Sequence, residues 1–184
     1  IARQERRRKL ASISDNIPRR ELSANDFVDA EDLFEQARAA AIDADSIAKR
    51  LASLIALEGI KGQSYESHGR SGHRSDAMRN TDRRIAFEEQ IRTRQAWDYA
   101  LIDLASEVIY GSNITGSGGI AAILGPQYAD AAWWRFCAAG TWVEVAEGSG
   151  MSEKWCRDNL HAVIDTVDAY GIRRVIDGIG LVGC

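Results

Sequence analysis

The chain has 184 residues, of which 45% are hydrophobic and 27% charged, and this composition is ordinary for a globular protein. Its formal net charge of −4 excludes a molecule that is positively charged as a whole. The sequence has no apolar run long enough to span a bilayer and no signal-peptide core, and its three cysteines lack the Cys-x-x-Cys spacing. We therefore expect a cytoplasmic protein with buried thiols and no membrane contact.

The composition predicts an all-α fold. Proline, which breaks helices, occurs only at Pro18 and Pro126. Ala, Arg, Glu, Ile and Leu, which favour helix over strand, dominate the chain. Basic residues gather at positions 1–20 and 70–94, with an acidic stretch at 26–45 between them. This asymmetry suits contact with nucleic acid or pairing between segments, and solvated helix faces with internal ion pairs are the alternative.

Residues 1–29 form a basic N-terminal arm. Apolar and alanine residues then recur at helical spacing over 30–57, and a second apolar stripe predicts a helix over 76–110. The glycines and serines of 63–75 predict a loop between them. We therefore expect a long antiparallel helical hairpin of the coiled-coil type over 30–110, which would serve oligomerisation or partner binding.

A glycine-rich linker at 111–119 predicts a domain boundary. Beyond it the sequence predicts four short helices, at 120–124, 128–139, 141–148 and 152–170. These make a helix-turn-helix domain over 120–172, and the apolar, glycine-rich residues 173–184 form a tail.

The last two of these helices carry the functional signal. Thr141 stands where a helix N-cap is expected, and Glu144, three residues later, completes a capping box. Gly148 to Met151 make a tight turn, and Ser152 caps the next helix. The inner stripe of that helix consists of Cys156, Leu160, Val163, Ile164 and Val167.

A recognition helix needs this arrangement, because its N-terminal turns enter the major groove of DNA. The candidate DNA-binding residues are Thr141, Ser152, Glu153, Lys154, Trp155, Arg157, Asp158, Asn159 and His161. The candidate contacts to backbone phosphate are Arg6, Arg7, Arg8, Lys9 and Arg135. An ordinary three-helix packing unit without a ligand is the alternative.

The segments Gly140-Thr141-Trp142-Val143-Glu144-Val145-Ala146 and Gly150-Met151-Ser152-Glu153 resemble the region-4 helix-turn-helix of sigma factors. A helical hairpin followed by this module is similar to phage transcriptional regulators of the RinA and ArpU kind. The resemblance implies a sequence-specific DNA-binding regulator of late genes, of phage or prophage origin, acting on double-stranded DNA in a bacterial cytoplasm. It also implies contact with RNA polymerase as a possible role of the hairpin.

The sequence departs from the region-4 pattern in its charge. Acidic residues outnumber basic ones between Asp130 and Arg174, whereas phosphate contacts normally supply most of the affinity for DNA. We therefore expect this module to bind weakly alone and to need help from the basic arm, from the 70–94 segment or from a second subunit. A homodimer would supply that help by pairing two recognition helices.

No other set of residues predicts chemistry. His68 and His73 have no third ligand nearby, so we expect no metal site and no cofactor. Gly116 to Ile120 lacks the lysine of a phosphate-binding loop, and no catalytic set is present, so we expect no enzyme activity. Two other classes stay open: a phage small terminase subunit, which a ring of many subunits would indicate, and a sigma-like protein-interaction module that binds no DNA.

Overall fold

The fold was obtained as a computed structural model, which describes residues 22, 26–60, 74–112 and 118–178. All regular elements in these ranges are helical, which confirms the all-α class for this part of the chain. They are α2 (Ala30–Ile60), α3 (Arg74–Tyr110), α4 (Gly119–Ile123), α5 (Pro126–Ala132), the π-helical turn η2 (Trp133–Cys137), α6 (Trp142–Ser149), α7 (Glu153–Tyr170) and α8 (Ile172–Asp177). None of the described helices combines the length and the apolar composition needed to cross a membrane.

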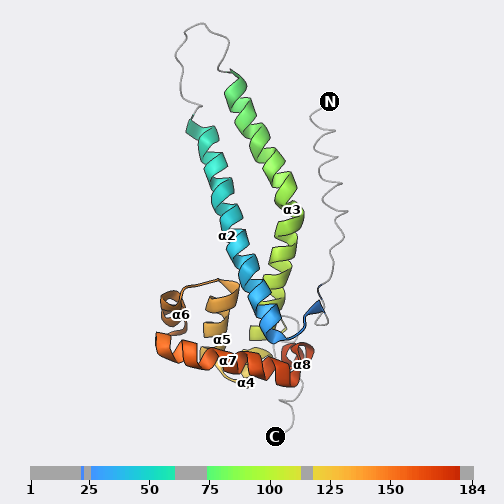
Figure 1. The fold of residues 1–184 in the computed structure, drawn as a ribbon, viewed down its shortest axis with the longest axis vertical. Helices are drawn as coiled ribbons and strands as arrows, with labels where there is room; N and C mark the ends of the chain where they lie inside the picture. The colour runs from blue at the N-terminus through green and yellow to red at the C-terminus, as the bar shows by residue number, and fades with distance from the viewer. Residues whose placement is uncertain (1–21, 23–25, 61–73, 113–117, 179–184) are drawn as a thin grey trace.

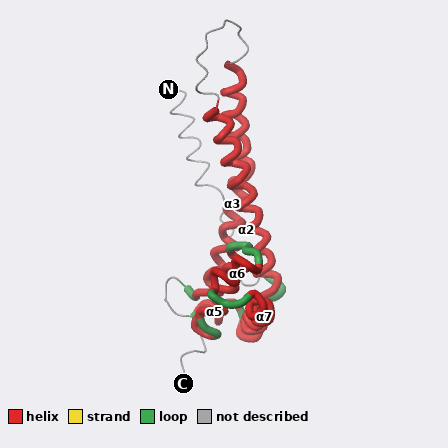
Figure 2. Tube along the Cα trace, turned by 90° about the vertical axis from the view of Figure 1, so that its left-hand side faces the viewer, coloured by secondary structure: helices red, strands yellow, loops and turns green. Residues whose placement is uncertain are grey.

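The helices α2 and α3 lie side by side over most of their length and form a long helical pair that projects from a cluster of shorter helices (Figure 1). The view from the side shows the same arrangement, with the short helices gathered at one end (Figure 2). Small side chains line the contact near the cluster: Ala37 and Ala40 on α2 and Ala105 on α3 are buried. Alanine lets the two backbones approach closely without lowering helix propensity.

The base of the helical pair and the short helices share one hydrophobic core. Phe34 of α2 stacks on Phe136 of η2, with ring centroids 4.8 Å apart, and both are buried. Val108 and Ile109 of α3 belong to the same cluster, together with Ile120, Val145, Val163, Val167 and Val175 from the short helices.

This shared core differs from the separate domains expected on either side of a linker at 111–119. Gly118 and Gly119, at its end, are buried. A Cβ atom on Gly119 would lie 2.2 Å from the backbone nitrogen of Gly111, so the start of α4 and the end of α3 meet at backbone contact. Gly118 and Gly119 therefore allow the backbones to pack closely. Residues 113–117 of the expected linker lie outside the described residues.

The single helix predicted over 128–139 is divided into α5 and η2. The amide of Ala138 donates to the carbonyl of Trp133 at 3.0 Å, and the amide of Gly140 donates to that of Trp134 at 2.8 Å. These spacings are wider than the four residues of an α-helix. The widened turn carries Phe136 and Cys137, both of which are buried in the core.

The expected tail also differs from the structure, because residues 172–177 form α8. Val175 and Ile176 are buried, and the Ile176 carbonyl accepts a hydrogen bond from the Ser112 amide at 3.3 Å. The helix ends at Gly178, which adopts the left-handed conformation with φ 67°. Burial of this short apolar segment against α3 and α4 explains why it is ordered as a helix.

A buried carboxyl group lies in the middle of the helical pair. Asp98 of α3 is 6% exposed and interacts with Asp43 of α2, which also pairs with Arg94. Burial, followed by the hydrogen bond and the negative charge of Asp43, raises the pKa of Asp98 to about 6. One oxygen of the Asp98 carboxyl group, Oδ2, is buried without a hydrogen-bond partner.

Candidate nucleic-acid interface

The helices α5, α6 and α7 pack on one another and form a three-helix unit at the end of the molecule (Figure 1). Thr141 is the N-cap of α6, as predicted, and its hydroxyl accepts a hydrogen bond from the Glu144 amide at 3.4 Å. The Glu144 carboxylate accepts in return from the Thr141 amide at 2.7 Å. This backbone hydrogen bond holds the pKa of Glu144 below its ordinary value. The capping box therefore fixes where α6 begins.

A short turn sets the direction of α7. Gly150 follows α6 in the left-handed conformation, with φ 69° and ψ 17°, and a side chain would be strained there. Ser152 is the N-cap of α7, and its hydroxyl accepts a hydrogen bond from the Trp155 amide at 3.2 Å. Both features agree with the sequence prediction of a tight turn followed by a capped helix.

One face of α7 packs into the core. Its buried side chains are Cys156, Leu160, Val163 and Val167. The opposite face near the start of the helix exposes Lys154, Arg157, Asp158 and His161, with Glu153 half-buried beside them. Five of the nine predicted DNA-binding residues therefore lie together on one outward surface, which we call the α7 face.

The charges on the α7 face are paired with one another. Arg157 forms an ion pair with Glu153 at 2.7 Å, and Lys154 lies 3.8 Å from Asp158. Both pairs join residues four positions apart on the helix and are open to solvent, so each contributes little to stability. The charges of these four residues cancel, so they give the face no excess of positive charge.

The guanidinium group of Arg157 is also oriented by an aromatic ring. It lies 5.5 Å from the centre of the Trp142 ring, and the guanidinium of Arg135 lies 4.3 Å from the same ring. Arg135, a predicted phosphate contact, also donates to the Gly140 carbonyl at 3.2 Å. Burial lowers the pKa of its guanidinium. Arg135 thus links η2 to α6, and its side chain is only partly accessible to a ligand.

Two further predicted contacts lie beside α5, away from the centre of the α7 face. The Trp155 ring packs edge-on against Tyr128, with centroids 4.9 Å apart. The Asn159 amide donates to the Trp155 carbonyl at 2.9 Å and accepts from the Tyr128 hydroxyl at 3.5 Å. Thr141 and Ser152 likewise use their hydroxyls as caps. The structure therefore gives these four residues roles in holding the helices in place.

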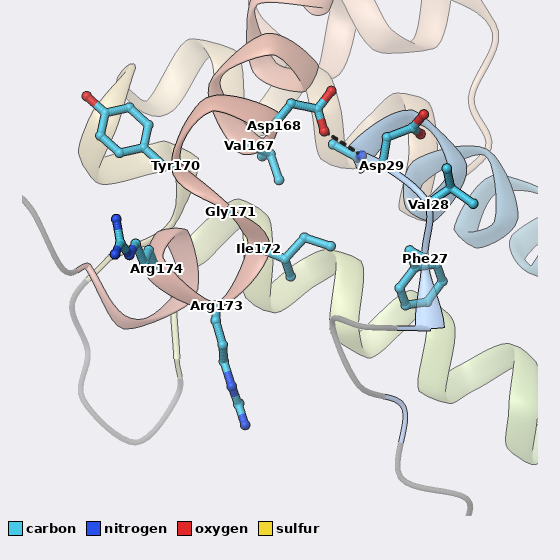
Figure 3. A pocket seen from close by; sticks show the side chains of 11 residues that line it. Phe27, Val28, Asp29, Val167, Asp168, Tyr170, Gly171, Ile172, Arg173 and Arg174 are labelled. Carbon is cyan, nitrogen blue, oxygen red and sulfur yellow. Dashed lines mark hydrogen bonds between the residues drawn. The ribbon is translucent and has the colours of Figure 1, made fainter.

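Four predicted phosphate contacts, Arg6, Arg7, Arg8 and Lys9, lie outside the described residues. The structure instead presents a basic pair that sequence reasoning missed. Arg173 and Arg174 of α8 are exposed, and their side chains leave the helix in different directions, with that of Arg174 on the side of Tyr170 (Figure 3). The signal that could have identified them is their position two and three residues after Gly171, in the first turn of a new helix.

These arginines border an open cleft of about 440 Å³ between the start of α2 and the junction of α7 with α8 (Figure 3). Phe27 and Ile172 form its apolar walls. At one side the Asp168 carboxylate accepts a hydrogen bond from the Ala30 amide at 2.7 Å, which ties the first turn of α2 to α7.

Among the described residues, no group of three or more His, Cys, Asp or Glu side chains is placed to hold a metal ion. Comparison of the chain with protein-family models, with curated proteins and with solved structures found no match.

Proposed function

We propose that this protein is a sequence-specific DNA-binding regulator whose α7 helix enters the major groove. The observation that carries the proposal is the α7 face. Two helix caps and a left-handed glycine direct the first turns of α7 outward, and the polar side chains of Lys154, Arg157 and Asp158 lie there in the open. A recognition helix presents its N-terminal residues to base edges in this way.

Arg157 is the residue we expect to contact a base. Arginine recognises guanine through two hydrogen bonds to O6 and N7, and such a pair supplies specificity. Its position over Trp142 limits the freedom of the guanidinium group before binding. Both partners of the Arg157–Glu153 ion pair lie on the outward side of α7. On binding DNA, Glu153 would give up this ion pair and leave Arg157 free to contact guanine, or would itself accept a hydrogen bond from a cytosine amino group.

The neutral charge of the α7 face requires phosphate contacts from elsewhere. Phosphate contacts supply the sequence-independent part of the affinity and fix the position of the protein on the duplex. Arg173 and Arg174 are exposed at the far end of the same module, and the basic arm at 1–20 is a second source.

The biological setting follows from the resemblance of 140–153 to sigma region 4 and of the whole arrangement to phage late-gene regulators. We propose that the protein acts on late genes of a phage or prophage in the cytoplasm of a bacterium. RNA polymerase is the partner that this resemblance implies. A ring of many subunits would favour a small terminase subunit, and the absence of salt-sensitive DNA binding would favour an interaction module.

The test begins with selection of bound duplexes from a random pool, followed by titration of the enriched duplex at fixed salt. We expect Arg157→Ala to weaken specific binding by about 1–3 kcal/mol while leaving the melting temperature unchanged. Asp165→Ala is the control, because Asp165 is also exposed on α7 and lies about two turns beyond Arg157. No enrichment would favour a protein-interaction module, whereas equal affinity of the two variants for an enriched duplex would show that Arg157 does not contact a base.

A further inference from the structure

The helical pair is divided by charge along its length. Its proximal half, next to the short helices, comprises residues 29–45 and 95–110 and holds nine carboxylates and one guanidinium, a formal charge of −8. Its distal half comprises residues 46–57 and 79–94 and holds seven basic and three acidic residues, a formal charge of +4. The two halves lie at successive levels of the same rod (Figure 1). Ion pairs between them form where they meet, from Arg94 to Asp43 and from Lys49 to Asp45, and the charges nearer the two ends of the rod lie too far along it to pair in this way.

The distal half also leaves apolar side chains uncovered. Ile47 and Ile91 are buried between the two helices. Around them the large apolar residues are half-buried or exposed, and these are Leu51, Leu54, Ile55, Leu57, Ile85 and Phe87. Ile55 and Leu57 are 52% and 50% exposed. Two helices cover only one face of each other, and a pair that extends beyond its core in this way lacks a second layer.

We propose that the helical pair binds a second copy of this chain in antiparallel orientation and forms a four-helix bundle. In that orientation the distal half of each molecule lies along the proximal half of the other, so positive charge meets negative charge at both ends of the bundle. Parallel packing would place like charges together, which costs several kcal/mol when they are juxtaposed. The charge pattern thus selects both the partner and its direction.

The distal apolar residues then pack against the partner's helices. Exposed Ile55 and Leu57 of α2 and Ile85 of α3 supply the surface that a second pair would cover. With 31 residues, α2 is about 46 Å long, so the two short-helix modules would lie at opposite ends of a bundle of about that length. This proposal stands apart from DNA binding and is tested without DNA.

The first experiment is sedimentation equilibrium of the full chain in about 0.1 M and about 1 M salt, where the screening length falls from about 10 Å to about 3 Å. We expect a dimer whose dissociation constant rises with salt. Ile55→Arg should give a monomer with unchanged helicity. Val143→Arg, at an equally exposed apolar residue on α6, should stay a dimer. A full chain that is a monomer at micromolar concentration overturns the proposal, and so does a ring of many subunits.

A charge swap tests the orientation. Arg79→Glu with Arg83→Glu reverses two exposed charges of the distal half, and we expect the dimer to weaken by about tenfold or more. Adding Glu31→Arg and Glu35→Arg to the same chain reverses two exposed charges of the proximal half and should restore the dimer. Rescue of this kind requires the distal half of one chain to face the proximal half of another. A dimer that the added changes weaken further would contradict the antiparallel arrangement.

Discussion

Between pH 3.8 and about 6, the buried carboxyl group of Asp98 is more protonated in the fold than in the unfolded chain. Its pKa is about 6 in the fold, against an ordinary value of 3.8, because burial and the nearby Asp43 both disfavour the charged form. The folded protein therefore binds a proton that the unfolded chain releases between these two values. The contribution of Asp98 to stability consequently falls as the pH rises from 3.8 to about 6 and stays low above that range.

We predict that Asp98→Asn stabilises the protein at pH 7 by about 1–3 kcal/mol, since asparagine removes the buried charge and can still donate to Asp43. The measurement is urea unfolding of both proteins at several pH values. The difference in free energy of unfolding between variant and parent should grow as the pH rises from 3.8 to about 6 and then level off. A variant that is less stable than the parent at pH 7 would show that the fold needs the Asp98 carboxylate.

Individual site residues could be predicted where the signal is local. The caps Thr141 and Ser152 are found as expected, because capping depends on residues three positions apart in the sequence. The roles of Trp155, Asn159 and Arg135 could not be predicted, because they depend on Tyr128, Trp142 and the Gly140 carbonyl, which approach only in the folded molecule.

The start of α4 and the end of α3 meet at backbone contact. Gly119 has φ 76°, and an added Cβ atom would meet three backbone atoms within 2.7 Å. Backbone atoms cannot move aside as a flexible side chain can. Gly150, in the turn before α7, also has a positive φ, but nothing lies within 4 Å of its Cβ position.

We predict that Gly119→Ala lowers the free energy of unfolding by about 2–4 kcal/mol, because strain in the left-handed conformation adds to overpacking. Gly150→Ala should cost only about 1–2 kcal/mol, from the left-handed conformation alone. Urea unfolding followed by circular dichroism compares the two. Equal losses would mean that α4 can move away from α3 and that the shared core tolerates the shift.

The long helices were predictable, since their periodic apolar residues extend over many turns, and the structure lengthens them only to Ile60 and from Arg74. The short helix α8 was missed. It has too few apolar residues to show a helical periodicity in the sequence. Its helix is stabilised by the packing of Val175 and Ile176 against the rest of the core. The π-helical turn was missed for the same reason, because its cause lies in the core that receives Phe136.

For the whole molecule, the uneven distribution of charge decides how it could bind DNA. The α7 face is neutral, and the proximal half of the helical pair is strongly acidic. A duplex docked on α7 would therefore experience repulsion from one side, and the basic arm at 1–20 would offset it. That arm carries seven basic and two acidic residues.

We predict that deleting residues 1–20 lowers the affinity for all duplex sequences alike. Contacts of this arm with phosphate would position the protein without distinguishing bases, so the slope of log affinity against log salt should become shallower as fewer counterions are released. The measurement is fluorescence anisotropy over a series of salt concentrations with enriched and scrambled duplexes. An unchanged slope would place the arm away from the DNA.

Methylation interference on the enriched duplex tests directly whether α7 reads the major groove. Methylation of guanine N7 blocks a contact in the major groove, where an α7 recognition helix would lie. We predict that methylation at specific guanines prevents binding of the parent protein, and that one of these positions loses its effect in Arg157→Ala. If no N7 methylation interferes with binding, α7 does not contact guanine in the major groove, and the protein does not bind DNA as proposed.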